Sequence, residues 1–172
     1  INSKDKNDNN CNYEDNQTNN DFEYDNEVYL NANHLMVFCS DTIKSSNKIE
    51  EILKAVIDLR KIMSSQDHMD LRVYDKMLKI GLVEDLLEML SLKYKSNIEL
   101  QKEVTWIFIC LSEVPISKID RLISTGIIKK LEALLDETTD NDIIQNIYWA
   151  LNHLVVNHIP AGDYLFQIKI FE

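Results

Sequence analysis

Glycine and proline are scarce in this chain of 172 residues, which has three glycines and two prolines. No apolar run approaches the roughly 18–20 residues that a membrane-spanning helix needs, so we expect no membrane partner. Three widely spaced cysteines supply neither a disulfide framework nor a zinc-binding spacing. A reducing location, cytoplasmic and/or nuclear, is therefore expected. So few turn-forming residues also favour a helical fold.

Signatures of catalysis and of cofactor binding are missing as well. With three glycines in all, the chain has no glycine-rich phosphate loop. Nor does it contain a Ser/His/Asp or Cys/His pairing with a local catalytic signature. His153 and His158 are five residues apart, and no carboxylate or cysteine stands at a matching ligand spacing. The sequence predicts a protein that is not an enzyme and that holds no metal or cofactor.

Basic residues are outnumbered by acidic ones. The chain has 18 Lys and Arg against 29 Asp and Glu, a net charge of −11. Such a charge repels nucleic acid and anionic membrane surfaces and attracts basic protein segments. We therefore expect no nucleic-acid partner, and expect basic peptide segments or other protein subunits as partners.

One block of sequence occurs twice. Gly81 and Gly126 open the two copies and are 45 positions apart, while Trp106 and Trp149 close them and are 43 positions apart. Between these markers each copy carries apolar residues at helical spacing. Self-similarity at this period is typical of helical solenoids, in which each unit stacks on the next because it cannot bury its apolar face alone.

Each copy has the pattern of a short, a medium and a long helix. Asn97 and Asp140 stand where a polar N-cap would start the long helices, and Pro115 and Pro160 follow them. The predicted fold is all-α, an armadillo-type right-handed α-solenoid of about two and a half repeats over residues 48–172. Its repeat boundaries are expected near 66–67, 115–116 and 158–160.

Residues 1–47 have a different composition. They carry three basic and nine acidic residues, and eleven asparagines lie in the first 33 positions. A segment with so few aliphatic residues buries too little apolar surface to offset its chain entropy. The sequence therefore predicts a largely disordered, acidic, Asn-rich leader.

Trp106 and Trp149 occupy the same position of the two long helices. One interpretation is core packing, because a repeated aromatic residue often fills the same interior space. The other is exposure at the edge of an apolar stripe that neighbouring residues already supply. That stripe comprises Val104, Phe108 and Leu111 in the first copy and Ile147, Leu151 and Leu154 in the second. Exposed rings one repeat apart can hold the stems and charged heads of Lys and Arg.

Leu100–Trp106 and Tyr148–Leu151 resemble the third helices of the armadillo repeats of importin-α (karyopherin-α). Asp58–Ser65, Ile123–Ile128 and Asp163–Leu165 are similar to other segments of that family, so the resemblance covers residues 48–172. It implies an adaptor for nuclear import, which binds extended basic segments of the nuclear-localisation-signal type on the concave surface of its third helices. The alternative is a divergent armadillo scaffold in a larger protein assembly, without nuclear-signal binding.

The resemblance also implies a set of site residues. In the family an asparagine four residues after the tryptophan holds the peptide backbone, and here Cys110 and His153 stand at those positions. Asn152 comes one residue early, and Asn157 stands where the family has an acidic residue. The predicted peptide-binding residues are Trp106, Trp149, Cys110, His153, Asn152, Asn157 and Gln145. The family recruits importin-β through a basic N-terminal segment, which the acidic residues 1–47 do not match.

Overall fold

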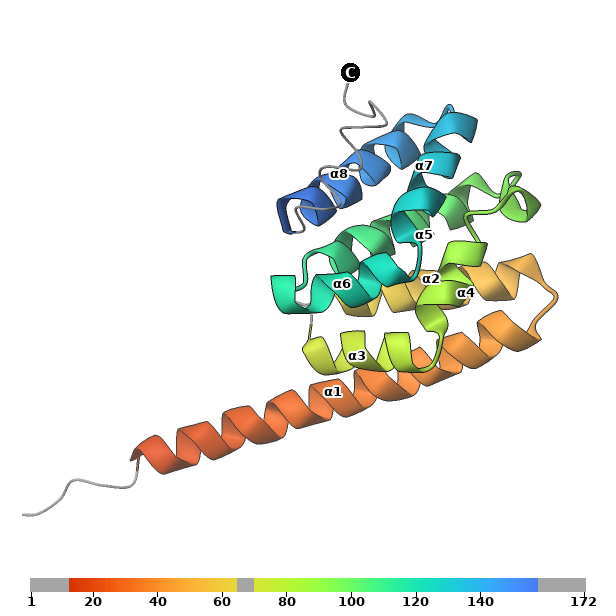
Figure 1. The fold of residues 1–172 in the computed structure, drawn as a ribbon. Helices are drawn as coiled ribbons and strands as arrows, with labels where there is room; N and C mark the ends of the chain where they lie inside the picture. The colour runs from red at the N-terminus through yellow and green to blue at the C-terminus, as the bar shows by residue number, and fades with distance from the viewer. Residues whose placement is uncertain (1–12, 65–69, 158–172) are drawn as a thin grey trace, which may run out of the picture.

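The structure is a computed structural model that describes the backbone of residues 13–64 and 70–157. Within these residues all regular secondary structure is helical and no strand occurs (Figure 1), so the all-α prediction is confirmed. The elements are α1 (Tyr13–Ser45), α2 (Ile49–Ser64), α3 (Leu71–Lys79), α4 (Leu82–Glu88), the 3-10 turn η1 (Leu92–Tyr94), α5 (Ile98–Ser112), α6 (Ile116–Ser124), α7 (Ile127–Glu137) and α8 (Asn141–Asn157).

Four helices form a row in which each packs on the next: α1, α2, α5 and α8 (Figure 1). The shorter helices α3, α4, α6 and α7 lie along one side of this row. The set α3–α4–α5 is repeated by α6–α7–α8, as the duplicated block predicts. The boundary expected near 115–116 falls between α5 and α6, whereas those near 66–67 and 158–160 lie outside the described residues.

Gly81 and Gly126 mark the equivalent turn in the two sets. Their φ angles are +74° and +85°, in the left-handed region, and each immediately precedes the second helix of its set. Side chains with a Cβ rarely adopt this conformation, whereas glycine adopts it freely. The two glycines therefore let the chain turn sharply between the first and second helix of each set.

Polar side chains start both long helices at the predicted places. The Asn97 side chain accepts a hydrogen bond from the Leu100 N–H at the start of α5. At the start of α8, an Asp140 carboxylate oxygen accepts from the N–H groups of Asp142 and Ile143. These contacts satisfy backbone donors that have no partner inside the helix.

The core runs without interruption along the row, from α1 to α8. Met36, Leu59, Phe108 and Leu151 are fully buried, one from each of these four helices. The predicted stripe of the long helices is likewise fully buried. Burial of one such side chain contributes roughly 1.5–3 kcal/mol, so the repeated apolar face accounts for the stacking of the helices.

The N-terminal segment differs from the prediction. Instead of a disordered leader over residues 1–47, the structure has one continuous helix from Tyr13 to Ser45, and residues 1–12 lie outside the described part. Neither glycine nor proline interrupts this stretch, and Ala32, Met36 and Cys39 form a buried stripe at helical spacing that packs on the core. The asparagine-rich composition of the segment does not reveal this stripe, because only the spacing of a few apolar residues shows it. The C-terminal part of α1 thus belongs to the packed structure.

Candidate functional site

Two exposed tryptophans lie side by side on successive long helices. Trp106 of α5 is 39% exposed and Trp149 of α8 is 49% exposed. Their ring centroids are 6.3 Å apart and the ring planes make an angle of 88°, so the edge of one ring meets the face of the other. The two residues thus form one aromatic surface at the edge of the core, as the stripe of neighbouring buried residues predicts.

A hydrogen bond from α5 to α2 holds this surface in place. The Trp106 Nε1–H donates to the hydroxyl of Ser64, at a distance of 3.2 Å. The same hydroxyl lies 3.9 Å from the Cys110 sulfur, one helical turn beyond Trp106. Three neighbouring helices, α2, α5 and α8, therefore meet at the tryptophan pair.

A hollow of about 260 Å³ opens beside the rings, and we call it the tryptophan hollow. It is lined by Met63, Ser64, Trp106, Ile109, Cys110, Glu113, Trp149 and His153. Glu113 is the one carboxylate among these eight residues; it is exposed and lies 3.9 Å from the Nδ1 of His153. The hollow thus combines aromatic walls with one negative charge, a combination that attracts a cationic side chain.

His153 and Cys110 offer little hydrogen bonding to a ligand in this hollow. The Nδ1 of His153 lies 3.2 Å from the Ser112 hydroxyl and is engaged there. His153 thus has one ring nitrogen, Nε2, left for a ligand, where an asparagine would present both a donor and an acceptor. Burial raises the pKa of the Cys110 thiol, which keeps it protonated and only a weak donor.

A second hollow, of about 360 Å³, continues along α5 on the other side of Trp106. Its cationic side chains are engaged in ion pairs. Arg60 donates to the Glu103 carboxylate, and the Lys102 ammonium lies 2.7 Å from Asp142 and 3.0 Å from Asp140. Hydrogen bonds to Asp142 and Asp140 raise the pKa of Lys102. These pairs join α2, α5 and α8 across the surface.

The structure gathers most of the predicted site residues, but not all of them. Trp106, Trp149, Cys110 and His153 line the tryptophan hollow, and Gln145 lines the second hollow. Asn152 is exposed on α8 and lines neither of them. Asn157 is the last residue of α8, and its side chain lies outside the described part.

Four residues that line the tryptophan hollow are not among the predicted site residues: Met63, Ser64, Ile109 and Glu113. Glu113 follows Trp106 by seven positions, two helical turns along the same face, so its spacing was a usable signal. Ser64 comes from α2, and no local pattern connects it with Trp106.

In the described part of the chain, no group of three His, Cys, Asp or Glu residues gathers in a way that could hold a metal ion. Among the same residues, no helix has the length and apolar character needed to cross a lipid bilayer.

No protein-family model and no curated protein matches this chain. Among solved structures, it is similar to an engineered protein that was a target of the Northeast Structural Genomics Consortium. The TM-score is 0.60 at 23% sequence identity, and the match covers 74% of this chain and 48% of the engineered one. The chain thus spans about half the length of that protein. At this level of identity, the likeness shows the fold alone.

Proposed function

We propose that the helices from α2 onward form an armadillo-type right-handed α-solenoid of about two and a half repeats. The support lies in the two equivalent sets, α3–α4–α5 and α6–α7–α8, with a left-handed glycine at the same turn of each. The period of the sequence repeat is in the armadillo range of roughly 40–47 residues. In this arrangement α2, α5 and α8 are successive third helices.

We infer that the protein is a peptide-binding adaptor resembling importin-α. It binds an extended basic segment of the nuclear-localisation-signal type on the surface formed by α2, α5 and α8, and acts in nuclear import between cytoplasm and nucleus. The observation that carries this proposal is the pair of exposed tryptophans, Trp106 and Trp149, on successive long helices.

Charge favours a basic ligand on this surface. The protein has a net charge of −11, and Glu113 places a carboxylate in the tryptophan hollow. The aliphatic stem of a Lys or Arg packs against the indoles while its charged end approaches Glu113. Because the rings touch edge to face, the basic side chain packs beside the pair rather than between the two rings.

The hydrogen-bonding groups of the tryptophan hollow favour a second candidate, a scaffold in a larger protein assembly. None of the eight residues that line it has a carboxamide, and the Nδ1 of His153 is taken by Ser112. A bound peptide backbone would forgo hydrogen bonds that contribute about 0.5–1.5 kcal/mol each. A folded partner has few unpaired backbone groups and needs no such bonds, so it would cover the tryptophans by apolar contact.

Intrinsic fluorescence is a site-specific assay here, because the chain has two tryptophans and both lie on this surface. Titration with a Lys/Arg-rich peptide should change the emission in a saturable way, and added salt should weaken the binding. A peptide with Gln in place of each Lys and Arg is the matched ligand control. No binding of the basic peptide at low salt would refute the adaptor.

Variants separate the two candidates. With a fluorescein-labelled basic peptide, Trp106→Ala and Trp149→Ala should each abolish the rise in anisotropy. Leu92→Ala removes an exposed apolar side chain of η1 and is the control that should bind normally. The scaffold predicts a different result. The wild type would not bind the peptide but would co-purify with a folded subunit, and neither tryptophan variant would retain that subunit.

A further inference from the structure

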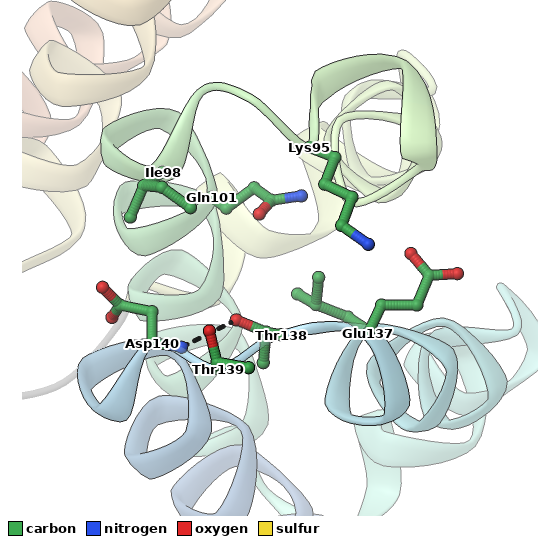
Figure 2. Close-up of a pocket in the computed structure, with 8 residues that line it drawn as sticks. Lys95, Ile98, Gln101, Glu137, Thr138, Thr139 and Asp140 are labelled. Carbon is green, nitrogen blue, oxygen red and sulfur yellow. Dashed lines mark hydrogen bonds between the residues drawn. The ribbon is translucent and has the colours of Figure 1, made fainter.

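A third hollow lies where α5 and α8 begin and α7 ends (Figure 2). It measures about 360 Å³ and shares no lining residue with the two hollows described above. Ile98 and Gln101 reach it from α5, Leu134 and Glu137 from α7, and Lys95 from the turn before α5. We call it the junction pocket. Its size is at the lower end of the range for small-molecule sites.

Gln101 gives the junction pocket a buried polar group. This side chain is 2% exposed, and Figure 2 shows it extending from α5 toward the side of the pocket where Lys95 lies. Its backbone carbonyl accepts from Thr105, but no hydrogen bond joins its carboxamide to any other residue in the described part of the chain. Buried amides are normally hydrogen-bonded, so this group is available to something that enters the pocket.

Helix packing does not account for an amide at this position. In the duplicated block, Leu100-Gln101 aligns with Ile143-Ile144, so the second copy has an apolar residue where the first has Gln101. The repeat pattern therefore does not require an amide at this position.

The walls of the junction pocket carry opposite charges. Lys95 stands next to the N-terminus of α5, where the helix dipole is positive, and Glu137 is the last residue of α7, where it is negative. Among the described residues, Lys95 and Glu137 form no ion pair with each other or with another group. Asp140 is already engaged, because it caps α8 and lies 3.0 Å from Lys102. One wall thus attracts an anion and the other a cation.

We propose that the junction pocket binds a small zwitterion, a free α-amino acid with a polar, uncharged side chain. Lys95 and the start of α5 hold the ligand carboxylate, and Glu137 and the end of α7 hold its ammonium group. Gln101 hydrogen-bonds the polar end of the ligand side chain, and Ile98 and Leu134 contact its aliphatic part. This site is independent of the tryptophan surface, so a test of ligand binding here neither supports nor refutes the proposed adaptor function.

Isothermal titration with glutamine tests the proposal. Glutamine should bind, and two analogues that each lack one charge, N-acetylglutamine and glutamine α-amide, should bind about tenfold more weakly or worse. Gln101→Met keeps the length of the side chain and removes its hydrogen bonds, and Lys95→Gln removes the charge from the rim. Both variants should weaken glutamine binding by a similar factor. Lys93→Gln, on η1 and outside the pocket, is the matched control that should bind as the wild type does.

The melting temperature provides a second readout. Glutamine at a fixed concentration should raise it more in the wild type and in Lys93→Gln than in Gln101→Met or Lys95→Gln. Lys95 is exposed, so Lys95→Gln is expected to fold and carries the test even if Gln101→Met does not. Absence of glutamine binding at millimolar concentration, or equal binding by wild type and Lys95→Gln, overturns the proposal. A crystal soaked in glutamine that shows only water at Gln101 also overturns it.

Discussion

A hydrogen bond between Thr105 of α5 and Asn146 of α8 should couple the stability of these two helices. Both side chains are buried, and the Asn146 amide donates to the Thr105 hydroxyl oxygen at 3.1 Å and to the Lys102 carbonyl at 3.4 Å. Thr105 in turn donates to the Gln101 carbonyl of its own helix at 2.9 Å. Asn146 therefore depends on α5 for its partners, whereas Thr105 keeps a partner without α8.

This asymmetry sets the expected magnitudes. Thr105→Val preserves the shape but leaves the buried amide of Asn146 with only its long bond, which should cost about 1–3 kcal/mol of unfolding free energy. Asn146→Leu removes the amide and leaves the Thr105 hydroxyl bonded to its own helix, so about 1 kcal/mol is expected. The double variant lacks the Asn146 amide, so no buried amide is left without its short hydrogen bond at this position. It should therefore be about 1–2 kcal/mol more stable than the sum of the single changes predicts.

Urea unfolding followed by circular dichroism measures this coupling. Thr42→Val is the control partner, because its hydroxyl donates within α1, at the other end of the row from α8 (Figure 1). Thr42→Val and Asn146→Leu should be additive within about 0.5 kcal/mol. Additivity of Thr105→Val and Asn146→Leu to the same precision would refute the coupling.

Three further predictions concern a glycine, a tyrosine and two cysteines. Gly126→Ala should lower the unfolding free energy by about 1–2 kcal/mol through backbone strain alone, because φ is +85° and nothing lies within 4 Å of an added Cβ. A variant that is more stable than the wild type in urea unfolding would contradict the left-handed turn. Burial raises the pKa of Tyr74 to about 12, so its neutral phenol stabilises the fold below the unfolded-chain pKa of about 10, and this contribution disappears as the pH rises from there to 12. Tyr74→Phe should remove that part of the pH dependence of unfolding, and an unchanged profile would count against it. Burial also raises the pKa of Cys110, and it raises that of Cys39 to about 11. Mass spectrometry should therefore show slow alkylation of both thiols by iodoacetamide at neutral pH, and the slowest reaction at the fully buried Cys39. Equal alkylation rates at the two cysteines would exclude the difference in burial.

The helices of the repeat could be predicted from the sequence because local signals and packing agree there. The two glycines lie at left-handed turns, Asn97 and Asp140 cap the long helices, and the apolar stripe of the long helices is buried. Each of these features depends on residues a few positions apart, so a single sequence contains the whole signal.

The N-terminal helix was missed because its composition and its pattern disagree. Asparagines and acids dominate residues 13–45, but the apolar residues of its second half, such as Met36, fall on one face and find α2 as a partner. Whether such a stripe is buried depends on what lies opposite, and one chain read by composition does not contain that information.

The exposure of Trp106 and Trp149 could be predicted, but the details of their surroundings could not. The ring contact and the hydrogen bond from Trp106 to Ser64 arise between residues 42 or more positions apart, on different helices. The same holds for the junction pocket, whose charged rim joins residues from two repeats. Side-chain contacts between repeats depend on how the helices stack, which periodicity alone does not determine.

The most direct test of the proposed binding surface is the response of the two indole N–H signals in a nitrogen–proton correlation spectrum. The chain has two tryptophans, so each signal reports on one ring of the site, and Trp106→Phe and Trp149→Phe assign them. With a Lys/Arg-rich peptide at low ionic strength, both signals should shift along the same saturation curve and stay unmoved with the matched Gln peptide. Two stationary signals in the presence of saturating basic peptide would contradict a peptide-binding role for this surface.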